Sequence, residues 1–314
     1  MRNFLRVGAL VLLLILPFSL FACGTDTPQT ADDSKLHIVT TVFPQYDMAR
    51  RIAGERATYT MLMGVGTSDA HAWEPTAGQF TKVSSADLFL TIGGESESWT
   101  HEVISAVALP AERVLSMLSV VEGLPAHDHD HTGHNHDHAL DEHVWTDPDN
   151  AILMARAICD ALCAIDAAGA DVYRANADAY LAELTALSAD YHAALDGAAQ
   201  KTLVVADKFP FRYLAHNYGL TYLAAFPGCA SDTEPSLAAI SELITTVTCE
   251  ESALVLRIAH GSTKIADAVA ESTGARIGIL HACHTVTAAE LAAGETYISL
   301  MRQNLSVLQE ALGL

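Results

Sequence analysis

The chain has 314 residues, of which 50% are hydrophobic and 18% are charged, a composition that excludes an intrinsically disordered protein. Its 38 acidic residues outnumber its 17 lysines and arginines, which gives a formal net charge of −21 with histidine neutral. Such a charge repels nucleic acid and anionic lipid surfaces, so it excludes a nucleic-acid-binding protein and points to a cation or a basic surface as the partner.

The beginning of the chain, residues 1–22, is predicted to be a signal peptide. Its apolar run Val7–Phe21 is shorter than the roughly 20 residues of a membrane-spanning helix, but it fits the hydrophobic region of a secretory signal. The run ends just before Cys23, an arrangement that resembles a bacterial lipobox. We therefore expect Cys23 to be lipidated and residues 23–35 to form a tether, with a plain N-terminal anchor as the alternative. Both predict an extracytoplasmic, membrane-anchored protein.

The rest of the chain alternates between strand-like and helix-like segments. Short apolar runs recur in both halves and are separated by longer helical patterns, which favours a parallel α/β sheet in each half. The predicted strands are residues 36–41, 58–62, 87–92 and 113–118 in the first half, and residues 201–206, 221–225, 253–258 and 276–280 in the second.

A long helix is predicted between the two halves, over residues 171–199. This segment has no proline, has no glycine before Gly197, and carries apolar residues at helical spacing. Roughly 25 residues in a helix span about 40 Å, which is longer than one small domain needs. The predicted fold is therefore α/β, with two parallel-sheet lobes at residues 36–169 and 200–314 joined by one long rigid helix at residues 170–199.

A histidine-rich segment interrupts the first lobe at residues 126–138. It reads AHDHDHTGHNHDH and contains no hydrophobic residue except Ala126, so we expect a solvated loop. Imidazole is a common ligand of zinc and similar ions, whereas the cost of ordering a flexible loop makes each such site weak. A merely soluble insertion is the alternative, but the alternation of aspartate and histidine favours weak metal capture. The histidines concerned are His127, His129, His131, His134, His136 and His138.

Four other histidines lie where a ligand site is expected. His71 and His143 lie in the loop-like segments GVGTSDAHAWEP and DEHVWTDPDNA, and His281 and His284 follow a predicted strand in the sequence HACH. Ligand sites of parallel α/β sheets lie just beyond the carboxyl ends of the strands. Taken singly, however, each of these residues is more often a hydrogen-bonded loop histidine than a ligand.

Five cysteines follow Cys23. An exported protein can form disulfides, but an odd number of cysteines leaves at least one thiol free. Cys159 and Cys163 are four residues apart on a predicted helix and are expected to pack as small hydrophobic residues. Cys229 and Cys283 lie in loops after strand-like runs and are the better disulfide candidates, although their pairing stays open.

Several segments together resemble the metal-binding class of ABC-transporter solute-binding proteins, which has zinc- and manganese-specific members. They are HIVTTVFPQYDMARRIAG, GVGTSDAHAWEPTAGQFTKVSSADLFLTIGGESESW, DEHVWTDPDNA and TYISLMRQNLSVLQEAL. The resemblance covers Leu36 to Leu314. It implies two α/β lobes bridged by a long helix, with one metal ion bound by four side chains in the cleft between the lobes. It also implies a histidine-rich loop at the mouth of that cleft, as in zinc-specific members.

The resemblance further implies the partners and the kind of activity. The protein is expected to be a monomer, not an enzyme, that delivers its metal to an ABC permease and its ATPase. Two alternatives remain: a secreted zinc hydrolase and a metal-binding surface adhesin. A helical His-x-x-Glu motif would support the hydrolase, but His71 and Glu74 are followed directly by Pro75, which suits a loop. A hydrolase also needs a general base beside an open metal position, and no residue clearly supplies one.

The first two ligand positions of the family fall on histidines with matching flanks, His71 and His143. The third position is usually a histidine, but Lys208 stands there in ADKFPFRYLAHNYGL. A lysine ammonium group has no lone pair to offer a metal. Asp207, one residue earlier, could supply an oxygen instead.

The fourth family position usually holds an acid directly after the last strand, and His281 follows Leu280 there, with His284 three residues further on. Two or three imidazoles with one carboxylate favour Zn²⁺ over Mn²⁺, which prefers more oxygen ligands. The resemblance therefore predicts a zinc site made of His71, His143 and His281, with Asp207 or His284 as the fourth ligand.

Overall fold

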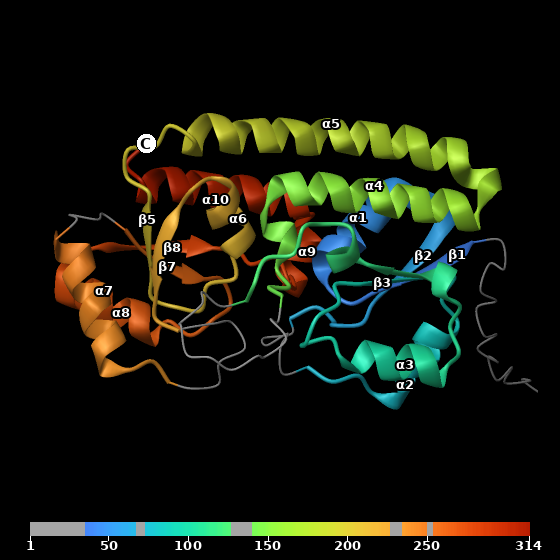
Figure 1. Ribbon diagram of the computed structural model, residues 1–314, viewed down its shortest axis with the longest axis horizontal. Helices are drawn as coiled ribbons and strands as arrows, with labels where there is room; N and C mark the ends of the chain where they lie inside the picture. Colours follow the sequence, from blue (N-terminus) through green and yellow to red (C-terminus); the bar gives the residue numbers. More distant parts are fainter. Residues whose placement is uncertain (1–34, 67–72, 127–139, 227–233, 250–253) are drawn as a thin grey trace, which may run out of the picture. The chain divides into compact units, whose positions relative to one another are not determined.

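The computed structural model describes most of the chain after the predicted tether (Figure 1). The described residues are 35–66, 73–126, 140–226, 234–249 and 254–314. Cys23, His71, Cys229 and the histidines of the histidine-rich segment lie outside these ranges. Residues 34–314 form one compact unit. Among the described residues, no helix is both long enough and apolar enough to span a membrane.

The N-terminal lobe is built on a parallel sheet with the strand order β2-β1-β3-β4. Its inner strands β1 and β3 are almost fully buried, as expected for parallel strands with both faces covered. The strands are β1 (Leu36–Thr40), β2 (Ala57–Met61), β3 (Leu88–Thr91) and β4 (Val114–Ser116). The helices of this lobe are α1 (Phe43–Ala53), α2 (Ala77–Ser84) and α3 (Trp99–Ala106).

The C-terminal lobe repeats this arrangement with a parallel sheet in the order β6-β5-β7-β8. Its strands are β5 (Thr202–Val205), β6 (Thr221–Ala224), β7 (Leu254–Ile258) and β8 (Arg276–Leu280). Its helices are α6 (Arg212–Asn217), α7 (Leu237–Cys249), α8 (Lys264–Thr273), α9 (Ala288–Ala293) and α10 (Tyr297–Ala311). Every strand predicted from the sequence is therefore present, within one or two residues at each end.

Two long helices, α4 (Pro148–Ile165) and α5 (Ala170–Leu195), pack side by side: α4 lies along the N-terminal lobe, whereas α5 extends along both lobes (Figure 1). Asp147 caps the N-terminus of helix α4, because its side chain accepts a hydrogen bond from the backbone N–H of Asp149. Helix α5 is unbroken over 26 residues, which corresponds to about 39 Å. The predicted long helix is confirmed, and it ends at Leu195 rather than at residue 199, just before the turn that contains Gly197.

One continuous hydrophobic core connects the two lobes. It includes residues of β1, α4, α5, β5 and α10. Three tyrosines of α5, Tyr173, Tyr180 and Tyr191, are among the largest fully buried side chains, and the hydroxyl of Tyr191 donates to the Met301 carbonyl of α10 at 2.7 Å. Helix α5 is thus packed along its whole length. The lobes are parts of one folding unit rather than separate domains on a linker.

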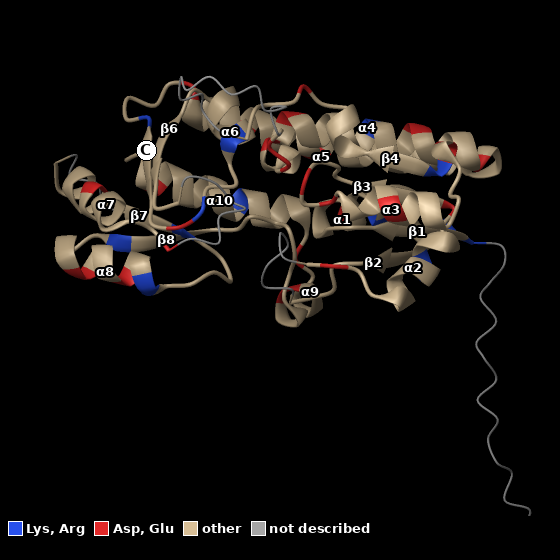
Figure 2. Cartoon of the chain, turned by 60° about the horizontal axis from the view of Figure 1, so that its bottom comes forward, with Lys and Arg blue, Asp and Glu red and all other residues tan. Residues whose placement is uncertain are grey.

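Short 3₁₀ turns complete the described secondary structure. They lie at Gly54–Arg56, Ala111–Arg113, Met117–Ser119, Val144–Thr146 and Ala167–Gly169. The charged residues are spread over both lobes. Figure 2 shows acidic and basic residues on the helices of each lobe in this view, with no face reserved for Lys and Arg.

The described cysteines are free thiols. Cys159 is buried and Cys163 is partly buried on α4, where both pack in the core as predicted. Cys283 is fully buried, and burial raises the pKa of its thiol well above the usual value. Its candidate disulfide partner, Cys229, lies outside the described residues.

Candidate metal centre

The loop between β8 and α9, residues 281–287, belongs to the C-terminal half of the chain but is tied to the N-terminal lobe. The backbone N–H of Phe43 donates to the His284 carbonyl at 2.8 Å, and that of Gly66 donates to the Val286 carbonyl at 2.9 Å. The indole N–H of Trp145 donates to the Ala282 carbonyl at 2.8 Å. These bonds fix the β8–α9 loop against three segments of the N-terminal lobe.

His143 is buried at the entrance of the 3₁₀ turn that precedes α4. One oxygen of the Asp141 carboxylate accepts hydrogen bonds from both the backbone N–H and Nδ1 of His143, each at 2.9 Å. This contact assigns the ring proton to Nδ1, so that the lone pair of Nε2 can face a cation. A carboxylate behind the imidazole is the usual support of a metal-binding histidine.

Asp141 is held in its charged form. Burial on its own raises the pKa of this carboxyl, but His143 and Arg212 beside it, together with the hydrogen bonds from His143, hold the pKa below its usual range. The anion is therefore available to orient His143 at neutral pH. This pairing gives the imidazole a defined direction before any metal arrives.

His284 comes from the C-terminal half and lies directly against His143. The two rings meet edge to face with their centroids 4.7 Å apart, and the His284 ring is 4.8 Å from that of Trp145. Both histidines were candidate ligands in the sequence, and the structure brings these two together. His71, the other predicted ligand, lies outside the described residues, after the segment that Gly66 ties to the β8–α9 loop.

His281 faces a different direction from His284. Its Nε2 lies 3.3 Å from Nε2 of His260, and its Nδ1 accepts the backbone N–H of Cys283 at 3.0 Å. The group that it joins contains His260 and Glu290 but neither His143 nor His284. The left-handed backbone at Cys283, with φ of 60°, separates the two ring directions. The geometry therefore places His284, rather than the predicted His281, beside His143.

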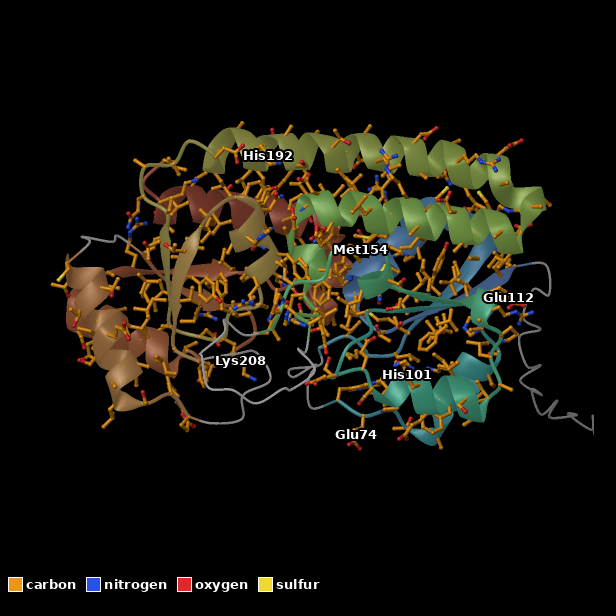
Figure 3. The ribbon with its side chains drawn as sticks, viewed as in Figure 1. Glu74, His101, Glu112, Met154, His192 and Lys208 are labelled. Atoms are coloured by element: carbon orange, nitrogen blue, oxygen red, sulfur yellow. The ribbon has the colours of Figure 1, made fainter. Side chains whose placement is uncertain are left out.

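Asp207 ties two strand ends together. Its Oδ2 accepts the backbone N–H of Ile258 at 3.0 Å, and its Oδ1 accepts that of Lys208 at 2.8 Å. Burial raises the pKa of this carboxyl, although the two backbone hydrogen bonds act to lower it. Both oxygens already have backbone donors, so this aspartate is better suited to joining β5 to β7 than to binding a metal. Figure 3 shows Lys208 on the loop that follows β5.

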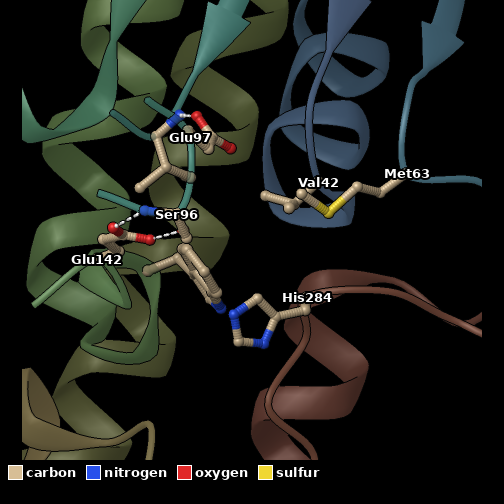
Figure 4. A pocket seen from close by; sticks show the side chains of 8 residues that line it. Val42, Met63, Ser96, Glu97, Glu142 and His284 are labelled. Carbon is tan, nitrogen blue, oxygen red and sulfur yellow. Dashed lines mark hydrogen bonds between the residues drawn. The ribbon is translucent and has the colours of Figure 1, made fainter. Parts of the chain in front are cut away.

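A small pocket opens beside His284 at the junction of the lobes (Figure 4). Its lining residues are Val42, Met63, Ile92, Ser96, Glu97, Glu142, Trp145 and His284. The Glu142 carboxylate accepts the backbone N–H of Ser96 at 2.7 Å and also the Ser96 hydroxyl. The position of Glu142 beside this loop requires a glycine at position 94, because a Cβ there would lie within 2.5–2.8 Å of the Glu142 side chain. Gly94 also has φ of +93°, which favours glycine.

Glu97 forms the inner wall of this pocket and is almost fully buried. Its Oε2 accepts the backbone N–H groups of Ile92 at 2.7 Å and Gly93 at 3.0 Å, just after β3. Burial raises its pKa to about 7. The loop after β3 is thus held by a carboxyl that carries its proton up to neutral pH.

Helix α6 holds both ends of the histidine-rich segment. The Tyr213 hydroxyl accepts the backbone N–H of Leu124 at 3.1 Å and donates to the Asp141 carbonyl at 2.9 Å. The two ends also pair with each other through an antiparallel bridge between Pro125 and Leu140. Because Asp141 also orients His143, the C-terminal lobe supports the position of this N-terminal ligand candidate.

Two residues that the sequence analysis did not single out as ligand candidates are His260 and Glu290. His260 lies two residues after the end of β7, whereas His281 comes directly after β8. Glu290 lies three residues after Thr287, at the position that completes a helix capping box. Both signals are visible in the sequence, but neither shows that the two side chains meet.

The fold and this centre define a two-lobed α/β binding protein with a rigid interlobe helix and paired histidines where the lobes join. The chain belongs to the family described as zinc-uptake complex component A, periplasmic, whose family model matches residues 38–311. The zinc-binding lipoprotein AdcA of Streptococcus pneumoniae is 32% identical over 309 residues, which cover 96% of this chain and 60% of AdcA. The chain thus spans about 60% of the length of this relative.

Other similar proteins match over nearly their whole length. The high-affinity zinc uptake system protein ZnuA of Bacillus subtilis is 29% identical, with 93% of each chain covered. The crystal structure of the Zn(II)-bound ZnuA-like domain of Streptococcus pneumoniae AdcA is 29% identical, with a TM-score of 0.76, and covers 89% of this chain and 100% of that domain. The metal-dependent lipoprotein YcdH of Bacillus subtilis is 26% identical, with a TM-score of 0.75 over 89% of this chain and 100% of YcdH.

Proposed function

We propose that this protein binds Zn²⁺ outside the cytoplasm and delivers it to an ABC-type permease and its ATPase for uptake. The observation that carries the proposal is the His143–His284 pair, in which Asp141 orients one imidazole for metal binding. The names of the relatives support zinc as the ion. The family is one of solute-binding proteins, so the protein acts as a binding and delivery component rather than as an enzyme.

The ligand set that we propose is His71, His143 and His284, with the fourth position filled by a further side chain or by water. It keeps two of the three principal ligands predicted from the sequence and moves His284 into the third place. Three neutral imidazoles suit Zn²⁺ better than Mn²⁺. Asp207 is the weaker candidate for the fourth position because both of its oxygens accept backbone hydrogen bonds.

The anchoring and the loading of the protein are part of the same proposal. Lipidation at Cys23 would keep the protein at the membrane beside its permease, and the protein would act as a monomer. The histidine-rich segment would collect zinc weakly and raise the local concentration of the ion near the centre. Both ideas concern residues outside the described part of the chain.

Zinc titration of purified, metal-free protein tests the central claim. His143→Ala and His284→Ala should each weaken the tightest zinc binding by at least 100-fold in a competition assay with a chromophoric chelator. His101→Ala is the matched control, because His101 is an exposed histidine on α3 (Figure 3), and it should bind zinc as the wild type does. Unchanged tight binding in both the His143 and the His284 variants would refute this centre.

A further inference from the structure

Three side chains from separate elements converge at the carboxyl ends of β7 and β8. Nε2 of His260 lies 3.3 Å from Nε2 of His281 and 3.2 Å from Oε1 of Glu290, which is itself 3.6 Å from Nε2 of His281. His260 follows β7, His281 follows β8, and Glu290 lies on α9. The described residues contain no other group of three or more His, Cys, Asp or Glu side chains whose ligand atoms lie this close together.

These separations match the edges of a zinc coordination tetrahedron. Zinc binds histidine nitrogen and carboxylate oxygen at about 2.0–2.2 Å, so neighbouring ligand atoms of a tetrahedral site lie about 3.3–3.6 Å apart. The three observed distances are close to this range. Two histidines and one glutamate are also a donor set that zinc uses in proteins, with the fourth position left open.

Each of the three side chains is positioned by its surroundings. Oε2 of Glu290 accepts hydrogen bonds from the backbone N–H and the hydroxyl of Thr287, at 2.7 and 2.9 Å, which leaves Oε1 facing the histidines. The amide group of Asn304 accepts the backbone N–H of His281 at 2.7 Å and donates to its carbonyl at 2.9 Å. His260 has φ of +65°, a left-handed conformation that is uncommon for residues other than glycine, and its Nε2 faces both His281 and Glu290.

We propose that His260, His281 and Glu290 form a second site for Zn²⁺, separate from the centre at His143 and His284. The side chain of His281 is only 9% exposed, whereas His260 and Glu290 are 35% and 24% exposed. The site is therefore closed by His281 on its inner side and open to solvent on its outer side. A water molecule or an incoming donor can take the fourth position, so the bound ion can exchange.

One short segment contributes a histidine to each of the two proposed sites. His281 begins the β8–α9 loop, and His284 lies three residues further along it. The second site goes beyond the proposed function, since uptake through the His143–His284 centre does not require it. Its place on the same loop suits an accessory site from which zinc passes to the buried centre.

Zinc binding at His281 exchanges one interaction for another. In the metal-free chain Nδ1 of His281 accepts the N–H of Cys283, so the neutral ring carries its proton on Nε2. A zinc ion on Nε2 displaces that proton, the ring takes a proton from solvent at Nδ1, and the Cys283 N–H loses its acceptor. The net proton count of the ring is unchanged. The lost hydrogen bond makes this site weaker than a centre whose histidine already has the right tautomer.

The protonation states at neutral pH fit this chemistry. Burial lowers the pKa of His281 to about 4, so the ring is neutral and needs no deprotonation at pH 7. The pKa of Glu290 is also below its usual range, because the hydrogen bonds from Thr287 and the nearby histidines outweigh its partial burial. Both groups are therefore in the form that binds a metal.

The number of zinc ions bound per chain tests the proposal. Full-length protein is dialysed against buffers of fixed free zinc in the micromolar range, and bound zinc is measured by elemental analysis. His260→Gln and Glu290→Gln should each bind about one zinc ion fewer than the wild type. Glutamine at position 290 can still complete the capping box with Thr287, so α9 should remain folded. His101→Gln, an exposed change on α3, should bind as many ions as the wild type.

The outcomes separate this site from the main centre. His143→Ala should lose the tightest ion but keep the one that His260→Gln loses, and the double variant should lose both. If His260→Gln and Glu290→Gln bind as much zinc as the wild type, the second site does not exist. If His143→Ala and His284→Ala bind as much zinc as the wild type, but His260→Gln and Glu290→Gln bind less, the proposed function loses its centre while the second site stands.

An NMR measurement distinguishes zinc binding by the three residues from a purely structural role. In the His143→Ala protein, zinc should shift the NMR amide signal of Cys283, because the hydrogen bond to His281 is broken when the metal binds. Adding Glu290→Gln should abolish that shift while the rest of the spectrum stays native. If the amide signal of Cys283 does not shift when zinc is added to the His143→Ala protein, zinc does not bind at His281.

Discussion

The two lobes share one strand order but present their candidate ligands in different ways. In the N-terminal lobe, His143 does not follow a strand; it lies in a buried turn before α4, and the Asp141 carboxylate holds its ring. In the C-terminal lobe, His260 and His281 lie within two residues of the ends of their strands, and the N–H of Cys283 donates to Nδ1 of His281. The N-terminal lobe therefore offers an oriented ligand, whereas the C-terminal lobe offers a more open and adjustable group.

This difference suggests that the N-terminal lobe holds the supports on which tight binding depends. The loop after β3 is fixed by Glu97, the segment before His143 by Glu142, and the imidazole by Asp141. Changes to these carboxyls should therefore have larger effects than changes elsewhere.

The largest effect is expected from Glu97 and concerns stability. Its pKa rises from 4.5 to about 7 on folding, so between these pH values the unfolded chain loses a proton that the folded chain keeps. Stability should therefore fall as pH rises through this window, by about 3 kcal/mol. Glu97→Gln should remove that part of the pH dependence, as measured by urea denaturation at pH 5 and pH 8. Glu95→Gln, an exposed neighbour, is the control; parallel curves for wild type and Glu97→Gln would contradict the assignment.

The next effect concerns the orientation of His143. Asp141→Asn removes the carboxylate that accepts from Nδ1, so zinc affinity should fall by about 10- to 100-fold. The loss should be measured by chelator competition. Asp166→Asn is a suitable control, because Asp166 pairs with Arg56 and makes no contact with the centre. Equal zinc affinity in the Asp141 variant and the wild type would show that this carboxylate does not act on His143.

A smaller effect is expected from the contact between the lobes at Tyr213. Tyr213→Phe removes the hydrogen bonds to Leu124 and Asp141, each worth about 1 kcal/mol, while it keeps the aromatic ring. Zinc affinity should fall by a few-fold, because Asp141 is then held less firmly. Tyr59→Phe, which removes a hydroxyl bonded to Gly54 in the N-terminal lobe, should leave the affinity unchanged. A Tyr213 variant with wild-type affinity would show that α6 supports only the fold.

Deleting residues 127–138 should change the number of zinc ions bound but not the affinity of the tight centre. The bridge between Pro125 and Leu140 holds the flanking residues close together, so a shorter connection can close there. Elemental analysis should show fewer weakly bound ions, and chelator competition should still detect one tight site. Loss of the tight site would show that the histidine-rich segment supplies ligands to it.

The smallest expected change is in overall dimensions. Helix α5 is unbroken from Ala170 to Leu195 and lies in a core shared by both lobes, so zinc should not swing the lobes about a hinge. Solution scattering should give nearly the same radius of gyration with and without zinc. Hydrogen exchange should slow in residues 206–210 and 281–287. A large decrease in the radius of gyration on zinc addition would show that α5 acts as a hinge.

The sequence predicted the eight strands because parallel strands buried on both faces are short continuous apolar runs. It predicted α5 because a helix held by a shared core keeps its apolar spacing without proline or glycine. It left the arrangement of the centre open. His281 and His284 are three residues apart and equally polar, and nothing in their spacing tells which ring turns toward His143.

The sequence by itself determined the element types, the lobe order and the set of candidate histidines, because periodicity and residue chemistry are local properties. The pairing of these candidates was decided only by the tertiary structure. The left-handed backbone at Cys283 and the hydrogen bond from Trp145 to the Ala282 carbonyl turn His284 toward His143 and leave His281 with His260 and Glu290. Such choices depend on contacts between residues far apart in the chain, where a small backbone rotation redirects a whole side chain.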